Sequence, residues 1–195
     1  MPLVYLVRHG RVTATPHDAR DPELDAAGQA QAEAAAQELQ RRLPHPLPIL
    51  CSPLRRCRET AAPLARAWNR EPRIEPRVIE VPSPHDPALS RDAWLDRVLG
   101  GSWDEAAQSG ERHEAGYAQR FARWRSDVAQ AVLDCAGDTV IFAHFIPINA
   151  LAAAALGASR VVSFRPANGS ITVFETGGGT IRLVEQGREV ASRVV

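Results

Sequence analysis

Lysine is missing from this chain of 195 residues, and all 23 of its basic side chains are arginine. Without lysine, the protein has neither a Walker-type phosphate loop nor the amine that Schiff-base catalysis requires. Any phosphate or carboxylate must therefore be bound by guanidinium groups, whose planar fork holds such anions through two parallel hydrogen bonds.

Cysteine and long apolar runs are also scarce. The three cysteines (Cys51, Cys57 and Cys135) form no C-x-x-C pair, so no disulfide framework is indicated. No apolar run is long enough for a membrane span, and the N-terminus lacks the pattern of a signal peptide. The formal net charge of +0 provides no global field to attract nucleic acid or an anionic membrane. We therefore expect a cytoplasmic protein.

Short apolar strands alternate with helical segments along the chain. We predict strands at 3–7, 48–52 and 139–143, helices at 25–43, 53–68, 117–135 and 147–156, an extended segment at 73–81, and a terminal hairpin from 170–174 and 180–184. Pro53 is placed at the first position of its helix. This alternation favours an α/β fold, a three-layer sandwich with a mostly parallel central sheet. No linker is visible, so we expect a single domain over residues 1–195.

Residues 82–116 are the least regular part of the chain, with Pro82, Pro84 and Pro87 followed by a Gly-Gly pair. We expect an excursion of short helical pieces rather than a core element, with its aromatic side chains used for packing. This excursion is the best candidate for a substrate lid.

Polar residues follow the ends of several predicted strands: Arg8 and His9, the segment 52–61, Glu80, and His144. In open α/β sheets, ligands bind beyond the carboxyl ends of the strands. Arginines can hold phosphoryl oxygens, a neutral imidazole can act as nucleophile, and a carboxylic acid can protonate a departing alkoxide. The set suits phosphoryl transfer without a metal, because positioning and charge stabilisation dominate that reaction.

Structural alternatives exist for these residues. Arg55 and Glu59 are four residues apart and can simply pair on a solvated helix face. Glu75 is a second acid near Glu80, and His144 after an apolar strand can be a core histidine. None of the remaining histidines has metal-ligand spacing, so we expect no metal and no cofactor.

Several of these motifs resemble those of the histidine phosphatase superfamily, the phosphoglycerate-mutase-like proteins. The strand followed by R-H-G at residues 8–10 matches, as does S-x-L-x-R-A-x-x-T-A over residues 52–61, with Cys57 in place of the motif's alanine. The strand ending at His144 and the N-G-S-I segment at 168–171 also match. The resemblance spans nearly the whole chain and implies a phosphoglycerate-mutase-like fold.

The resemblance also implies a role for each site residue. His9 would attack phosphorus and become a phosphohistidine, while Arg8, Arg56 and His144 bind the phosphoryl oxygens. Glu80 would protonate the leaving oxygen and then help to activate water. These roles describe a metal-independent phosphatase that hydrolyses a small phosphorylated metabolite, with neither nucleic acid nor membrane as partner.

Three other functions stay open. They are a phosphoglycerate mutase, a protein phosphohistidine phosphatase, and a non-catalytic binder of phosphorylated ligands. Family mutases are longer than this chain, and the small phosphohistidine phosphatases lack an acid equivalent to Glu80, which favours hydrolysis. The complete set of histidines, arginines and acid argues against a binder.

The chain departs from the family pattern at positions on the approach to the site. The family often has R-H-G-x-T-x-x-N, where this chain has Val12 and Thr15. Thr15 still offers a hydroxyl to a phosphate, whereas Val12 does not. Phe145 follows the second histidine where glycine is usual, and residues 81–84 replace a G-x-W-E-G stretch. The sequence therefore leaves the substrate open, and it does not give the oligomeric state.

Overall fold

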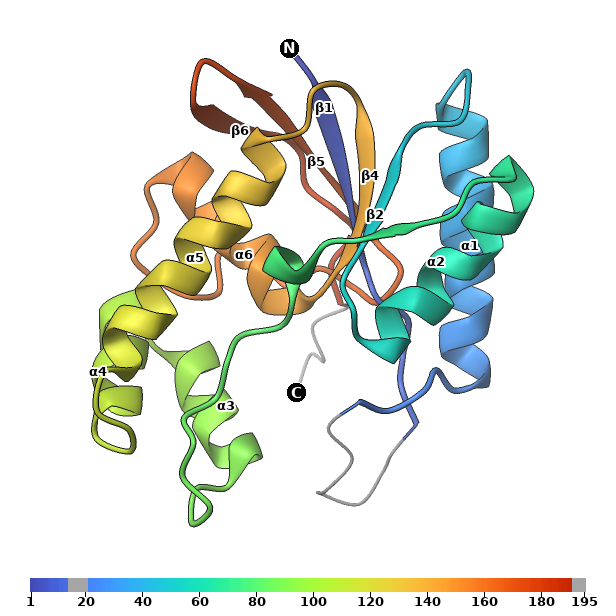
Figure 1. Cartoon of the computed structure of the whole chain (residues 1–195). Helices are drawn as coiled ribbons and strands as arrows, with labels where there is room; N and C mark the ends of the chain where they lie inside the picture. Colours follow the sequence, from blue (N-terminus) through green and yellow to red (C-terminus); the bar gives the residue numbers. More distant parts are fainter. Residues whose placement is uncertain (14–20, 191–195) are drawn as a thin grey trace.

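The structure, a computed structural model, describes residues 1–13 and 21–190 (Figure 1). Six strands of this described part form one sheet in the order β3-β2-β4-β1-β5-β6. Their bounds are β1 (Leu3–Arg8), β2 (Ile49–Cys51), β3 (Arg73–Ile74), β4 (Thr139–Ala143), β5 (Ile171–Gly177) and β6 (Thr180–Glu185). The first four run parallel, and β5 and β6 are antiparallel to their neighbours. The predicted mostly parallel sheet is confirmed.

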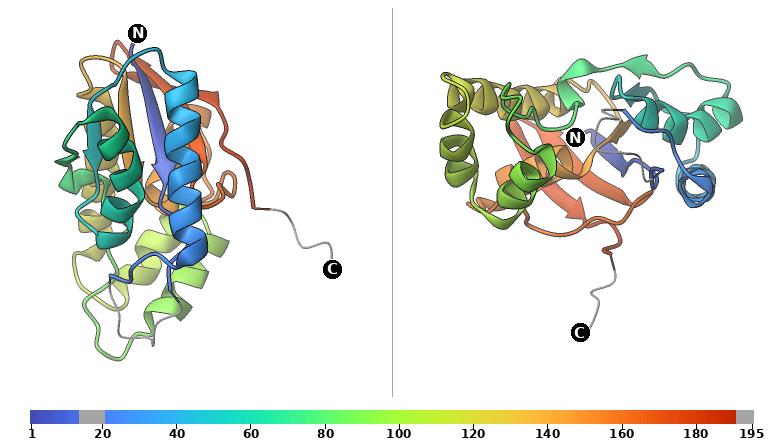
Figure 2. Two further views of the ribbon diagram at one scale, coloured as in Figure 1. Left: turned by 90° about the vertical axis from the view of Figure 1, so that its right-hand side faces the viewer. Right: turned by 90° about the horizontal axis from the view of Figure 1, so that it is seen from below.

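Helices cover both faces of this sheet, which confirms the three-layer α/β architecture (Figures 1 and 2). One face carries α1 (Ala26–Arg42) and α2 (Arg55–Trp68). The other face carries α5 (Tyr117–Leu133) and α6 (Phe145–Leu156), with α3 (Arg91–Gly100) and α4 (Trp103–Glu111) beside α5. No helix within the described ranges is long and apolar enough to cross a membrane.

Alternating side chains of the strands build the two cores. In β1, Val4 and Leu6 pack in the core under α5 and α6, whereas Tyr5 and Val7 pack in the core under α1 and α2. This alternation follows from the period of two residues in a strand. Because both faces are covered, the strand sequence is continuously apolar, and polar chemistry is left to the strand ends.

The start of α2 differs from the prediction. The helix begins at Arg55 rather than at Pro53, because Leu54 has extended backbone (φ -70, ψ 140) and serves as the N-cap without a side-chain cap. The carboxylate of Asp21 replaces that cap, with both oxygens 2.8 Å from the Arg55 amide nitrogen that donates to them. The capping group comes from a distant loop, so a local sequence pattern could not reveal it.

Residues 73–81 are not one extended segment, contrary to the prediction. Only Arg73–Ile74 pair as a strand, and Pro76–Val78 form a short 3₁₀ helix, η1. Glu75 caps η1 by accepting the Arg77 amide N–H, and it also forms an ion pair of 2.8 Å with the Arg77 guanidinium. Glu75, the second acid near Glu80 in the sequence, therefore stabilises this turn through its own hydrogen bond and ion pair.

The excursion at 82–116 contains two short helices, as predicted, yet it is also part of the core. Trp94 on α3 is 0% exposed and Trp103 on α4 is 3% exposed. Trp94 meets the ring of Tyr117 edge-on at 6.1 Å, and both tryptophans join the core shared with α5 and α6. The expectation of a segment outside the core is wrong, because single large aromatics in short helices contribute no repeating apolar pattern.

Candidate active site

The sheet register brings the two predicted histidines together. Arg8 and Ala143 are register partners at the ends of β1 and β4, so His9 and His144, which follow them, are neighbours. The His9 amide donates to the Ala143 carbonyl oxygen at 3.0 Å. The two imidazole rings meet edge to face, with their centroids 5.3 Å apart.

His9 is held as a neutral imidazole in one tautomer. Its Nδ1 lies 2.8 Å from the carbonyl oxygen of Gly10, and because a carbonyl only accepts, Nδ1 carries the proton. Burial, together with the charges of Arg56 and Arg8, lowers the pKa of His9 to about 3. At neutral pH, Nε2 therefore has an unprotonated lone pair, the form that a nucleophilic histidine requires.

The hydroxyl of Thr60 on α2 fixes the backbone that carries His9. Thr60 Oγ1 accepts the Gly10 N–H at 3.0 Å and donates to the Arg56 carbonyl oxygen at 2.6 Å. One buried hydroxyl thus connects the turn after β1 to the helix that carries Arg56. Sequence reasoning missed this role, and the only available signal was the position of Thr60 inside the family motif.

Two further contacts hold the turn at His9. Asn168 donates from its side-chain amide to the His9 carbonyl oxygen at 2.9 Å. A Cβ atom at Gly10 would lie 2.5 Å from the Gly28 carbonyl oxygen on α1, so the close approach of these two segments requires glycine. The R-H-G and N-G-S-I motifs are therefore in contact, although they stand at opposite ends of the chain.

His144 is fully buried and is also neutral. Its Nε2 lies 2.8 Å from Ser52 Oγ, and the Leu54 amide donates to the same Oγ at 3.4 Å. Burial is the main reason that the pKa of His144 lies well below its ordinary value. The thiol of Cys57 donates to the Ala143 carbonyl oxygen at 3.3 Å and lies 3.4 Å from the His144 Nε2. The cysteine that departs from the family motif thus packs against the second histidine.

Arg8 brings a partly buried guanidinium to the same strand end. Its Nη1 donates to the Pro166 carbonyl oxygen at 2.7 Å, and its Cζ lies 5.0 Å from the ring centroid of Phe145. The family departure at Phe145 therefore places an aromatic face against the arginine. The Arg8 Nε–H is buried and has no hydrogen-bond partner in the described part of the chain.

The two neighbouring arginines of α2 face in different directions. Arg56 is 8% exposed, and its Nη1 lies 3.5 Å from the Asp21 carboxylate. Arg55 faces solvent and pairs with Glu59 at 2.6 Å and with Glu23. The pair with Glu59 is the structural alternative that the spacing of four residues indicated for Arg55. The motif register, which placed Arg56 rather than Arg55 at the site, agrees with this arrangement.

Glu80 lies just beyond η1, in surroundings that stabilise the protonated carboxyl group relative to that of an exposed glutamic acid. Burial raises the pKa of Glu80, and the charges of Arg56, Arg91 and Arg8 oppose that shift only in part. Its Oε1 accepts the Val81 amide N–H at 2.9 Å. The electrostatic influence of Arg8 and Arg56 on Glu80 and on both histidines puts all five predicted catalytic residues in one neighbourhood.

Helix α5 anchors the main chain on both sides of Glu80. Trp124 donates from its indole N–H to the Ile79 carbonyl oxygen at 3.0 Å. Tyr117 donates from its hydroxyl to the Pro82 carbonyl oxygen at 2.8 Å. The sequence pattern places both aromatics in a helix but does not indicate that they position the acid.

A cleft of about 930 Å3 opens beside Glu80. Its walls come from the start of α2, from the segment 79–92 and from Arg120 on α5. The predicted phosphate-binding residue Thr15 lies outside the described residues. Within the described ranges, no group of three or more His, Cys, Asp and Glu side chains is arranged to hold a metal ion.

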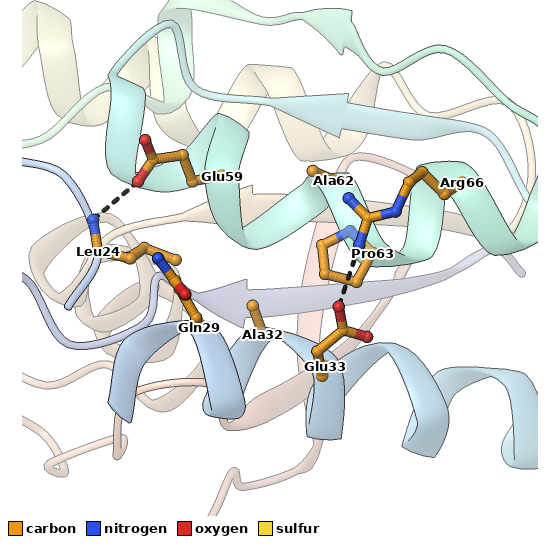
Figure 3. Close-up of a pocket in the computed structure, with 8 residues that line it drawn as sticks. All are labelled: Leu24, Gln29, Ala32, Glu33, Glu59, Ala62, Pro63 and Arg66. Atoms are coloured by element: carbon orange, nitrogen blue, oxygen red, sulfur yellow. Dashed lines mark hydrogen bonds and ion pairs between the residues drawn. The ribbon is translucent and has the colours of Figure 1, made fainter. Parts of the chain in front are cut away.

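A second, smaller hollow lies between α1 and α2 (Figure 3). The Arg66 guanidinium pairs there with Glu33 at 3.0 Å, and the Glu59 carboxylate accepts the Leu24 amide N–H at 2.7 Å. These polar groups already satisfy one another, and the hollow includes none of the predicted site residues.

Comparisons with known proteins identify the fold and the family of this chain. No curated protein matches the sequence. Among solved structures, a mycobacterial glucosyl-3-phosphoglycerate phosphatase in complex with VO3 is 26% identical, with 98% of this chain and 100% of that chain covered and a TM-score of 0.66. Two further structures share the fold. One is a phosphoserine phosphatase from Entamoeba histolytica in complex with 3-phosphoglyceric acid, which is 20% identical, with 98% of each chain covered and a TM-score of 0.70. The other is YhfR from Bacillus stearothermophilus, which is 20% identical, with 98% of each chain covered and a TM-score of 0.74. The family model of the histidine phosphatase superfamily (branch 1) matches residues 4–189. The chain therefore belongs to branch 1 of the histidine phosphatase superfamily.

Proposed function

We propose that the protein is a metal-independent, cytoplasmic phosphatase that hydrolyses small phosphomonoesters through a phosphohistidine. The observation that carries this proposal is the hydrogen bond between His9 Nδ1 and the Gly10 carbonyl, which leaves Nε2 free as a nucleophile beside Arg8 and Arg56. Family membership and the 26% identity to a mycobacterial phosphatase support it.

In the first half of the reaction, His9 Nε2 attacks phosphorus while the bond to the leaving oxygen breaks. Glu80 gives its proton to that oxygen, and its raised pKa keeps the proton available at a higher pH than for an ordinary glutamic acid. Arg8 and Arg56 bind the peripheral oxygens, where the transferred group carries its charge. In this mechanism Ser52 donates to the Nε2 of neutral His144, which lies 2.8 Å from Ser52 Oγ, and the His144 Nδ1–H is offered to another oxygen.

In the second half, a water molecule attacks the phosphohistidine. The Glu80 carboxylate takes a proton from the water as the new P–O bond forms and the P–N bond breaks. Inorganic phosphate leaves, His9 regains its Nε2 lone pair, and Glu80 is again protonated. The sum is one ester plus one water converted to one alcohol plus one phosphate.

We further propose that residues 82–116 cover the alcohol part of the substrate within a single domain over residues 1–195. Support comes from the wall of the cleft, much of which is formed by the residues that follow Glu80. The segment is tied down by His113, whose Nδ1 lies 2.9 Å from the Asp86 carboxylate, and by Glu114, which accepts the His85 amide N–H at 2.7 Å.

The proposal is tested by trapping the intermediate. Protein dialysed against a chelator is mixed with p-nitrophenyl phosphate, quenched without acid, and analysed by intact mass and peptide mapping. We expect one phosphate on His9, no turnover in His9→Ala, and full turnover in the control His45→Ala, which changes an exposed histidine. Wild-type turnover by His9→Ala, or activity that a divalent ion alone restores after dialysis, would refute the proposal.

A further inference from the structure

We propose that Arg91 binds a carboxylate on the leaving group, so that the enzyme prefers phosphomonoesters whose alcohol carries a carboxylate close to the ester oxygen. The inference rests on the proposed function, because it concerns the alcohol part of the ester that His9 would cleave. It concerns a side chain outside the family motifs.

Arg91 and Glu80 line the same cleft, and His9 is not among the residues of its wall. Arg91 is the first residue of α3, follows the N-cap Ser90, and lines the cleft together with Glu80. Its positive charge lowers the pKa of both Glu80 and His144, so it acts at electrostatic range on the reacting groups. If Glu80 protonates the leaving oxygen, the carbon atoms bonded to that oxygen enter the space that Arg91 borders.

Most other charged groups in the wall of the cleft are already engaged. Arg120 pairs with Glu114 at 2.6 Å and donates to the Ser83 carbonyl oxygen at 3.1 Å. The Nδ1 atom of His85 lies 3.2 Å from the Oε1 atom of Glu114. The Arg120 charge is therefore largely neutralised by an internal partner, and a substrate anion would have to compete with Glu114 for it.

Arg91 differs from these residues. No hydrogen bond or ion pair joins Arg91 to another residue in the described ranges, and its side chain is exposed. The acids of the same wall have partners of their own: Asp86 accepts from Ala88 N–H and contacts His113, and Asp92 is also engaged. Because Arg56 would bind the phosphoryl group in the proposed function, Arg91 is the cation without a partner in the described ranges that this wall presents to the leaving group.

The chemistry of one guanidinium favours a carboxylate. Its planar fork matches the two oxygens of a carboxylate and forms two charge-assisted hydrogen bonds with them. A second phosphate group would bring about two negative charges toward a wall that also carries Asp86 and Asp92. A neutral alcohol would leave Arg91 without a partner.

The test uses two pairs of esters that differ at one group. 3-Phosphoglycerate and glycerol 3-phosphate differ by a carboxylate against a hydroxymethyl group, and phosphoserine and phosphoethanolamine differ by a carboxylate alone. We expect kcat/KM to be about tenfold or more higher for the carboxylate member of each pair, the scale of a charge-assisted bidentate contact. In Arg91→Gln this ratio should fall to near one, and Arg91→Lys should keep part of it. Arg97→Gln, at an exposed position of the same helix outside the cleft, should keep the full ratio.

The outcomes separate this inference from the proposed function. Equal kcat/KM within each pair, or an unchanged ratio in Arg91→Gln, would overturn the inference while a phosphorylated His9 keeps the phosphatase in place. If Arg91 acts only through Glu80, its loss changes both members of a pair equally and shifts their pH profiles alike, which also overturns it. No phosphate on His9 and no hydrolysis of any ester would overturn the proposed function, and the inference with it.

Discussion

Replacing Thr60 by valine should destabilise the protein, because it removes one hydroxyl and almost no volume. The buried Gly10 N–H, now 3.0 Å from Thr60 Oγ1, would lose its acceptor. Leaving such a donor unsatisfied costs about 1–3 kcal/mol. The Arg56 carbonyl oxygen, which also contacts this hydroxyl, sits in a helix, so the larger part of the cost falls on Gly10. Urea unfolding of the wild type and Thr60→Val measures the difference in free energy of unfolding.

Thr172→Val is the matched control for this change. Thr172 is also fully buried, but its hydroxyl has no hydrogen-bond partner among the described residues. The same substitution there should leave the free energy of unfolding within about 0.5 kcal/mol or raise it, because no bond is lost. Equal destabilisation by both variants would refute the reasoning.

Catalysis gives an independent readout of the Thr60 bond. Because Gly10 also holds the Nδ1–H of His9, loosening the turn should lower kcat of the folded Thr60→Val protein by about tenfold or more. Thr60→Ser keeps the hydroxyl and should restore most of kcat, even though it loses a methyl group. A kcat unchanged in Thr60→Val under conditions where the protein is folded would show that Thr60 supports stability alone.

Two predictions concern the acid and the nucleophile. Glu80→Gln should lower kcat for an alkyl phosphate by about a hundredfold or more. Its effect on phosphoryl transfer from p-nitrophenyl phosphate, measured in single turnovers, should be smaller because p-nitrophenolate leaves unprotonated. Equal slowing with both substrates would exclude Glu80 as the leaving-group acid. The pH dependence of kcat/KM should also report the titration of Glu80. Because Glu80 acts when protonated and its pKa is raised, kcat/KM for an alkyl phosphate should fall as the pH rises through that pKa. Glu80→Gln should lack this fall. On the acid side, the pKa of His9 is lowered to about 3, so an inactivating protonation near the ordinary value of 6.5 would contradict a buried, neutral His9.

The parts of the fold that follow from local chemistry were predictable from the sequence. The apolar runs of β1 and β4 lie where predicted, and Asp25 caps α1 by accepting the Gly28 N–H at 2.7 Å. Gly157 ends α6 in a left-handed conformation (φ 64), as a glycine after a helix indicates. The start of α2 was not predictable, because its capping carboxylate belongs to Asp21, more than thirty positions earlier.

The residues of the candidate site were also predictable from the sequence, whereas the contacts between them were not. Strand-end positions singled out His9 and His144, but their contact requires β1 and β4 to be neighbours, and the sequence pattern did not predict this strand order. The tautomer of His9 depends on a bond to the Gly10 carbonyl, and the second histidine depends on Ser52. Such bonds between side chains and backbone need coordinates, because the same residues occur in many sequences without making them.

The anchoring of Glu80 by α5 has a consequence for protein engineering. Trp124 and Tyr117 bind the carbonyl oxygens of residues 79 and 82, and every amino acid offers that group. The acid is thus positioned without reliance on the side chains that follow it in the wall of the cleft. A library randomised over exposed positions of 83–92 can therefore retune the preference for the alcohol while the proton donor stays in place, which makes selectivity and chemistry separately evolvable in this scaffold.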